Sequence, residues 1–225
     1  MGESGGRQGL TPVQGKGAWT LLEVLVVVAI IAILAALLFP VLNRGRPLAE
    51  RVTCANNVRQ IDLAIHIYAD EHGDELAYFT NDIYYSYKLC VSPYVTQSQN
   101  STSNQPMFIC PADSGLYALS LTYYSSYGFN GVERGTNDFG MAGRQFSTVH
   151  NPSKTALDGE ISGGIGISWH DRRPQGQYND APNVGGFVDG HVSYVKIYWN
   201  GAGGVAGFPF YYEPPPNYEY QWTAN

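Results

Sequence analysis

The sequence has few charged residues and few cysteines. Only 14% of its 225 residues are Asp, Glu, Lys or Arg, and the formal net charge is −6, which gives no support to nucleic-acid binding. Three cysteines are too few for a disulfide scaffold, and they form no C-x-x-C pair. The G-x-S-x-G, H-E-x-x-H, G-x-G-x-x-G and phosphate-loop motifs are also missing, so we predict that the protein is not an enzyme.

Charge is missing altogether from one stretch, Val24–Leu42. Its nineteen residues include no charged or strongly hydrogen-bonding side chain. A helix of that length extends roughly 28 Å, which matches the hydrocarbon thickness of a bilayer. The rest of the chain holds nothing comparable, so we predict one membrane span with a large polar domain on its C-terminal side.

A cleaved secretory signal peptide is the first alternative for this stretch. Such peptides have an apolar run of about 7–15 residues followed by an A-x-A-like site. Here the run is longer, Ala29, Ala32 and Ala35 are spaced by three, and Asn43 and Arg44 follow. A plain signal anchor that stays in the membrane is the stronger alternative.

One carboxylate, Glu23, stands at the edge of the apolar run, in the segment KGAWTLLEV. A charge there costs on the order of a few kcal/mol unless it is paired, which makes it a functional indicator. The segment resembles the class III leader of type IV pilins and type II secretion pseudopilins. In that family a leader ending in Gly or Ala is followed by an aromatic residue, Thr, Leu and then Glu.

The resemblance implies a processing site at Gly17, Ala18, Trp19 and Glu23. A cut after Ala18 makes Trp19 the first mature residue and Glu23 the fifth, the family position; a cut after Gly17 is the alternative. The same register puts Pro40 at the twenty-second mature position, where these helices carry a proline. In the family, the glutamate pairs with the N-methylated terminal amine of a neighbouring subunit.

A second helical stretch is predicted over residues 44–73. We expect Pro40 to kink or open the helix, which resumes after Arg46-Pro47 and ends at Gly73. Several apolar residues give this stretch a wide buried face. A narrow polar arc holds Arg59, Asp62, His66 and Asp70, of which His66 and Asp70 are expected to form a solvated i,i+4 pair.

From about Asp74 the composition changes to Gly, Asn, Ser, Tyr and Pro with short apolar runs, which predicts strands and long loops. Asp189-Gly190 between two β-prone runs predicts a hairpin. Lys154–Asp158 predicts another strand. The tail, 201–225, is expected to be an irregular surface segment, with an aromatic glycan-binding surface as the alternative.

Four stretches extend the resemblance to prepilin-type proteins with a C-terminal His-spacer-Asp-Gly region. They are residues 54–60, 108–113, 126–130 and 187–192. The implied fold is α+β and pilin-like: a long N-terminal helix, half transmembrane and half amphipathic, packed on a small antiparallel sheet with long loops. The implied organisation is a leader (1–18), a transmembrane or filament-core helix (19–43), an amphipathic half (44–73) and a globular β-rich domain (74–225).

A metal site is one interpretation of the His-spacer-Asp-Gly region. Eighteen residues separate His170 from Asp189, about twice the family spacing. With Asp158, Glu160 or Asp180 as a further ligand, these side chains suit calcium, which prefers oxygen ligands. The alternative, which we favour, is that the turn selects Asp189-Gly190, that His170 forms hydrogen bonds within its loop, and that there is no cofactor.

The resemblance also bears on the cysteines. Cys54 and Cys110 lie within family-like motifs, whereas Cys90 lies in an apolar run where a free buried thiol is ordinary. We expect a Cys54–Cys110 disulfide, because the folded domain should lie outside the cytoplasm. Three reduced thiols are the alternative.

The resemblance implies a filament subunit, most of all a type II secretion pseudopilin. Its partners would be the membrane, prepilin peptidase, an assembly platform, and copies of itself or other pilin-like subunits, without nucleic acid. It would reside in the inner membrane as a single-pass protein and then in a periplasmic or cell-surface filament. The alternative is a permanently membrane-anchored surface protein that binds polysaccharide or metal with its β domain.

Overall fold

The computed structural model describes residues 19–76, 86–95, 106–113, 124–131, 140–171, 179–199 and 213–224. The expected leader, with Gly17 and Ala18, lies outside the described residues. The chain divides into two compact units, Met1–Arg44 and Gly45–Asn225.

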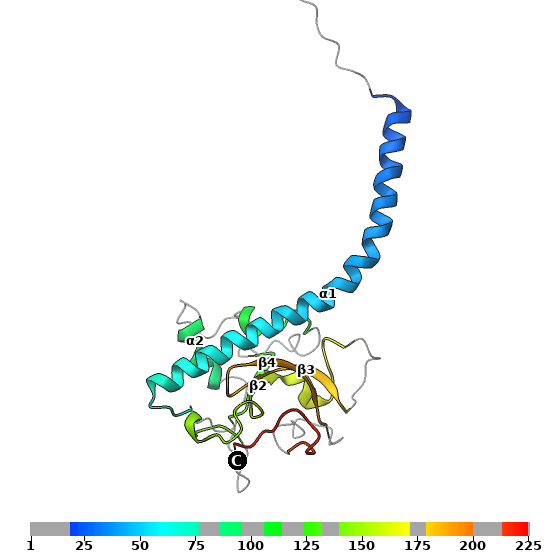
Figure 1. The fold of residues 1–225 in the computed structure, drawn as a ribbon. Coiled ribbons are helices and arrows are strands. Elements are labelled where there is room, and N and C mark those ends of the chain that lie inside the picture. Colours follow the sequence, from blue (N-terminus) through cyan, green and yellow to red (C-terminus); the bar gives the residue numbers. More distant parts are fainter. Residues whose placement is uncertain are drawn as a thin grey trace, which may run out of the picture. The chain divides into compact units, whose positions relative to one another are not determined.

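One long helix, α1, runs from Leu21 to Glu71 and belongs to both units (Figure 1). Its helical backbone continues through Pro40 and Pro47, so one long N-terminal helix is confirmed, and the expected opening at Pro40 with a restart after Pro47 is wrong. A proline removes the one hydrogen bond that its own nitrogen would donate, and the turns on either side keep theirs.

The C-terminal end of α1 is closed at Gly73, as the sequence predicts. Gly73 has a φ of +72°, and the N–H of Asp74 donates to the carbonyl oxygen of Ala69 over 2.8 Å. This six-to-one bond over a left-handed glycine is a Schellman motif, which satisfies a carbonyl that the helix leaves open. The helix proper ends two residues earlier than the predicted 44–73 stretch.

The second unit is α+β. Its sheet has four antiparallel strands in the order β1-β2-β3-β4. The strands are β1 (Tyr127–Phe129), β2 (Ala156–Glu160), β3 (Ala181–Phe187) and β4 (Val192–Ile197). The predicted hairpin is confirmed, since β3 and β4 pair from Ala181↔Ile197 to Gly186↔Val192. The strand predicted at Lys154–Asp158 exists two residues further along, as β2.

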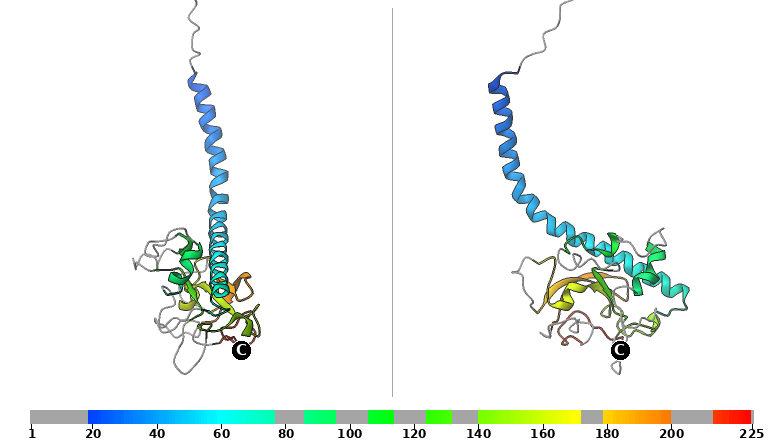
Figure 2. Two further views of the ribbon diagram at one scale, coloured as in Figure 1. Left: turned by 90° about the vertical axis from the view of Figure 1, so that its left-hand side faces the viewer. Right: turned by 180° about the vertical axis from the view of Figure 1, so that it is seen from behind.

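The two faces of the sheet are covered differently. Figures 1 and 2 show the C-terminal half of α1 along one face and the chain's last described segment on the other. The first face forms the main core, in which α1 residues such as Val58 and Ile61 pack with Tyr127, Leu157 and Val184. On the second face, Ala156, Phe187, Val195 and Ile197 pack with Tyr220 and Trp222.

Two sequence predictions for this unit are corrected by the structure. The region after Asp74 was expected to hold only strands and loops, but it contains a ten-residue helix, α2 (Ser86–Val95). Residues 201–212 of the tail lie outside the described residues. Residues 213–224 are not a surface segment throughout, because Tyr220 and Trp222 are buried and Gln221 pairs in parallel with Thr155. These rings fill the second core rather than forming a glycan-binding surface.

Three short 3-10 helices complete the described elements. They are η1 (Pro106–Phe108), η3 (Phe146–Thr148) and η4 (Ile161–Ile165). η1 leads into Cys110, and η4 follows directly on β2 and leads towards His170. η1 and η4 therefore position Cys110 and His170, which are described below.

Candidate functional site

In the first unit, Thr20 and Glu23 form a reciprocal cap at the start of α1. Glu23 accepts hydrogen bonds from the Thr20 backbone N–H and hydroxyl, each over 2.8 Å, and the Glu23 N–H donates to the Thr20 hydroxyl over 3.3 Å. This is a capping box, the T-x-x-E arrangement that satisfies open donors at a helix start. Glu23 therefore has a local structural role besides its expected role in assembly, and Trp19 beside it is exposed.

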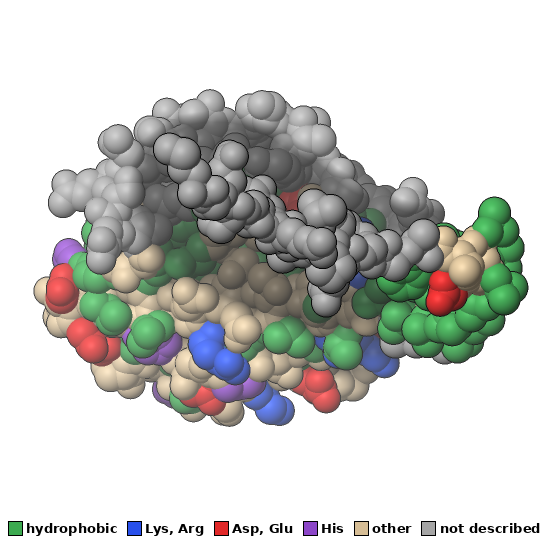
Figure 3. All heavy atoms as spheres, turned by 90° about the horizontal axis from the view of Figure 1, so that it is seen from above, with side chains coloured by type: hydrophobic (Ala, Val, Ile, Leu, Met, Phe, Trp, Pro, Cys, Tyr) green, Lys and Arg blue, Asp and Glu red, His purple; other side chains and the backbone are tan. Residues whose placement is uncertain are grey.

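The helix that follows the cap is apolar on every side. Leu21–Pro40 has a mean hydropathy of 3.2, and it is long and apolar enough to cross a membrane. Every large apolar side chain from Leu21 to Phe39 is between 46% and 82% exposed in the isolated chain. Figure 3 shows these side chains as a mass of hydrophobic atoms. An apolar surface this extensive on a monomer indicates contact with lipid or with other chains.

The resemblance motifs of the second unit meet around the buried side of α1. Asn57 donates to the carbonyl oxygen of Ile109 over 3.3 Å and to the hydroxyl of Tyr127 over 3.2 Å. Asp113 accepts hydrogen bonds from Tyr124 and Ser126. These polar side chains satisfy one another in the interior, so their first role is to fix the loops against the helix.

Cys54 and Cys110 are joined by a disulfide, the pairing that the sequence analysis expects. The bond ties α1 to the loop after η1, with Cα atoms 5.3 Å apart. Cys90 on α2 is free and half-buried, rather than fully buried.

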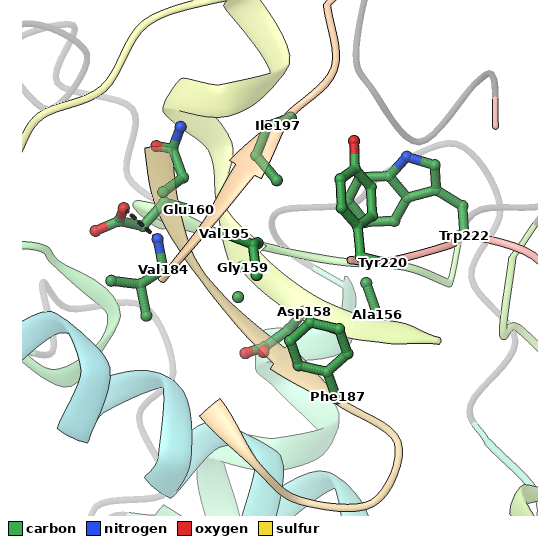
Figure 4. A pocket seen from close by; sticks show the side chains of 12 residues that line it. Ala156, Asp158, Gly159, Glu160, Val184, Phe187, Val195, Ile197, Tyr220 and Trp222 are labelled. Atoms are coloured by element: carbon green, nitrogen blue, oxygen red, sulfur yellow. Dashed lines mark hydrogen bonds between the residues drawn. The ribbon is translucent and has the colours of Figure 1, made fainter. Parts of the chain in front are cut away.

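Glu160 and His170 lie against this disulfide. The Nε2 of His170 is 2.7 Å from the Oε1 of Glu160, and each of these atoms is 3.5 Å from the Sγ of Cys110. Neither side chain has any solvent exposure. The second carboxylate oxygen of Glu160 accepts a 2.9 Å hydrogen bond from the Val184 N–H, drawn as a dashed line in Figure 4.

A second buried polar pair joins α1 to the sheet. Asp62 and Asp158 are each 1% exposed, and no other group among the described residues donates a hydrogen bond to either carboxylate. An added Cβ on Gly186 would lie 2.2 Å from Asp62 Oδ2 and 2.3 Å from Asp158 Oδ1. The two carboxyl groups thus meet over the bare Cα of Gly186. Two anions this close in the interior repel, so the pair is stable when one member is protonated and donates to the other.

Burial governs the titration of this pair. Loss of water, and next the negative charge of Asp158, raise the pKa of the Asp62 carboxyl well above its usual range. Asp189 adds to this rise, while Arg59 opposes it. Burial raises the pKa of Asp158 too, whereas the nearby Asp62 carboxyl and Gly186 N–H act to lower it.

The second face of the sheet holds a small pocket (Figure 4). Its volume is about 20 Å³, and its lining includes Ala156, Phe187, Val195, Tyr220 and Trp222. That is room for about one water molecule. A polysaccharide therefore has no cavity to enter here.

Of the predicted metal site, His170, Asp158 and Asp189 are not brought together, whereas Glu160, one of the further candidates, lies 2.7 Å from His170. His170 faces Glu160 and Cys110, Asp158 faces Asp62, and Asp189 is exposed on the β3–β4 turn. Asp189 Oδ1 instead lies 2.5 Å from Nδ1 of its neighbour His191. Asp158 lies within β2, whereas Asp189 lies in the turn after β3, so the two carboxylates are carried by different segments of the sheet.

The surroundings of His66 also differ from those that the sequence predicts. Its ring nitrogens lie 2.7 Å from the Asp62 carbonyl oxygen and 2.9 Å from the Val188 carbonyl oxygen, and its ring stacks on Phe146. The expected solvated pair with Asp70 is therefore wrong. A histidine that reaches the backbone of the turn after β3 cannot also lie along the outer surface of the helix.

The sequence analysis names Glu160 only as one of three possible further ligands beside His170, and the structure places it there. It puts Asp62 on the polar arc of the helix and so misses its burial. A faint signal existed, since Asp62 interrupts the apolar residues Ile61, Ala64 and Ile65, all of which are buried.

No family model, curated protein or solved structure matches the chain.

Proposed function

We propose that the chain is a pilin-like filament subunit, most closely a type II secretion pseudopilin. The observation that carries the proposal is the start of α1: a Thr20–Glu23 cap followed directly by the apolar, exposed helix Leu21–Pro40. The same helix continues into a disulfide-tied α+β unit. A subunit that is stored in a membrane and later packs by its helix into a filament requires this combination.

The chemistry at the helix start supports this use of the helix. Cleavage between Ala18 and Trp19 leaves the apolar helix on the mature chain and creates an amine four residues before Glu23. The carboxylate of one subunit then pairs with the amine of another as helices pack, and the pair offsets the cost of removing Glu23 from water. The proposed route leads from the inner membrane, with the C-terminal unit outside the cytoplasm, into a periplasmic or cell-surface filament.

The rival is a permanent membrane anchor that carries a binding domain. It requires neither cleavage nor assembly. Mass analysis of the mature N-terminus, together with shearing of cells followed by sedimentation, separates the two proposals. We expect a chain that begins at Trp19 and sheared material that sediments as filaments. A mature chain that retains Met1 and never leaves the membrane fraction would contradict the filament proposal.

An uncleavable variant sharpens the comparison. Ala18→Leu changes the residue before the proposed cut and leaves Trp19, Thr20 and Glu23 in place. We expect this variant to accumulate in the membrane with its leader and to give no filaments. Wild-type amounts of filament from a chain that still carries residues 1–18 would also contradict the proposal.

A further inference from the structure

The four side chains around the disulfide come from four separate segments. Cys54 lies on α1, Cys110 follows η1, Glu160 ends β2, and His170 lies beyond η4. Their sulfur, nitrogen and oxygen atoms all lie within 4.8 Å of one another. All four side chains are withdrawn from solvent.

These residue types are those of a tetrahedral zinc site. Zinc binds Cys sulfur at about 2.3 Å and His nitrogen or carboxylate oxygen at about 2.0–2.2 Å, so neighbouring S and N or O ligands stand about 3.5 Å apart. Cys110 Sγ is 3.5 Å from both His170 Nε2 and Glu160 Oε1. The sulfur–sulfur and the His170–Glu160 separations must widen when an ion enters.

The surroundings hold the candidate ligands in position. The Val184 N–H donates to the Oε2 of Glu160, which leaves Oε1 directed at the sulfur and the imidazole. The backbone N–H of His170 donates to the Ser168 hydroxyl over 3.3 Å. The bond to Glu160 is of the kind that orients a metal ligand. The Nδ1 of His170 is buried and has no hydrogen-bond partner among the described residues.

We propose that this cluster is a redox-gated zinc site: when the Cys54–Cys110 disulfide is reduced, the two sulfurs, His170 and Glu160 bind one Zn²⁺ ion. Two soft thiolates and an imidazole favour zinc over calcium or magnesium. The oxidised form binds no ion, because the sulfur lone pairs of a disulfide are poor ligands and the bond holds the sulfurs too close together.

The chemistry balances with a dithiol as the reductant. The dithiol supplies two electrons and two protons and becomes a disulfide itself, the Cys54–Cys110 bond breaks, and two thiols form. Zinc then displaces both thiol protons to solvent. It also takes the Nε2 lone pair of His170, so the ring proton resides on Nδ1 and the hydrogen bond to Glu160 is exchanged for two bonds to the ion. Reoxidation by an external disulfide reverses the sequence and releases the ion.

The test compares oxidised and reduced forms of the full chain in detergent. After anaerobic treatment with dithiothreitol and its removal, Co²⁺ is titrated as a spectroscopic substitute for Zn²⁺. We expect one Co²⁺ per reduced chain, with a sulfur-to-cobalt charge-transfer band and the visible bands of tetrahedral Co²⁺, both abolished by one equivalent of Zn²⁺. The oxidised chain should show neither band. X-ray absorption of the zinc form should show two sulfur and two nitrogen or oxygen neighbours.

Variants separate a built site from thiols that bind metal by chance. Glu160→Gln and His170→Asn should each lower the Co²⁺ affinity of the reduced chain on the order of tenfold to a hundredfold or more. Cys90→Ser and His191→Asn, which alter a cysteine and a histidine outside the cluster, should bind as the wild type does.

Several results would overturn the proposal. One is a reduced wild-type chain that binds Co²⁺ no better than the oxidised chain. Another is a reduced chain whose circular dichroism shows unfolding that Zn²⁺ does not reverse, because the ligands then do not converge without the disulfide. A third is binding that persists in His170→Asn but disappears in Cys90→Ser, which would assign the metal to loose thiols.

Discussion

Asp62 on α1 and Asp158 on β2 present their carboxyl groups to each other over the Cα of Gly186. The contact joins the helix to the sheet through two groups that repel when both are ionised. Among the described residues, other titratable or charged groups near the pair include Arg59, His66, Tyr87, Tyr127 and Asp189. Stability of the second unit should therefore depend on pH through this contact.

The sign follows from the direction of the pKa shift. Folding raises the pKa of Asp62, so the folded chain holds a proton that the unfolded chain releases above about pH 4. The free energy of unfolding should fall as pH rises from there through the raised pKa, by about 1.4 kcal/mol per pH unit where one proton differs. Asp62→Asn keeps a side-chain donor for Asp158 but has no proton that titrates in this range. The free energy of unfolding of this variant should therefore fall less steeply with pH.

Urea unfolding of the purified chain from about pH 4 to about pH 8 measures this dependence. Asp70→Asn is the matched control, because Asp70 lies two turns further along α1 and is exposed. It should leave the wild-type slope in place. Parallel pH curves for wild type and Asp62→Asn would show that the pair does not share a proton.

Gly186 is needed because it has no side chain. An alanine Cβ there would lie 2.2 Å from Asp62 Oδ2, closer than atoms can approach, whereas a Cβ on Gly185 would lie 3.7 Å from Val195 Cγ2. We expect Gly186→Ala to lower the free energy of unfolding by about 1–3 kcal/mol and Gly185→Ala to change it little. Equal effects in urea unfolding would refute the close approach.

The Cys54–Cys110 disulfide should carry a large share of the stability. It closes a loop with a sequence separation of 56, which corresponds to roughly 4 kcal/mol on the chain-entropy model. Reduction in the presence of a chelator should lower the unfolding midpoint strongly, and Cys90→Ser should not. Non-reducing peptide mapping checks the pairing, and a peptide that joins Cys90 to either partner would contradict it.

Glu23 both caps α1 and carries a negative charge, and two substitutions separate these two roles. Glu23→Gln keeps an acceptor for the Thr20 N–H but removes the charge, whereas Glu23→Ala removes both. If the proposed pairing with a neighbouring amine drives assembly, both variants should lose sheared filament. Normal filament from Glu23→Gln, with loss only in Glu23→Ala, would assign Glu23 to capping alone.

Trp222 anchors the end of the chain on the second face of the sheet. It is 5% exposed and packs on Tyr220, with ring centroids 4.9 Å apart. Trp222→Ala should cost about 3–5 kcal/mol in urea unfolding, since it opens the second core. Glu219→Ala, at an exposed position nearby, is the control. A negligible loss in Trp222→Ala would mean that the tail is not part of the folded unit.

Features that depend on neighbouring residues could be predicted from the sequence. The apolar run Leu21–Pro40 is a matter of composition, the stop at Gly73 needs only one left-handed residue, and Asp189-Gly190 specifies its own turn. The α2 helix was missed because Pro93 lies inside it and its residues have no clear helical period. The disulfide was expected from motif resemblance rather than from geometry.

The sequence by itself determined where the chain is apolar, where α1 ends and where the hairpin turns, because these features arise from contacts within a few residues. Only the tertiary structure decided what the polar residues do. Asp62 faces the interior because β3 offers the bare Gly186 opposite it, and Cys54, Cys110, Glu160 and His170 converge because four segments fold against one another. A helical wheel gives the direction of Asp62 from the helix axis, and the burial of that side chain depends on the strands that pack there.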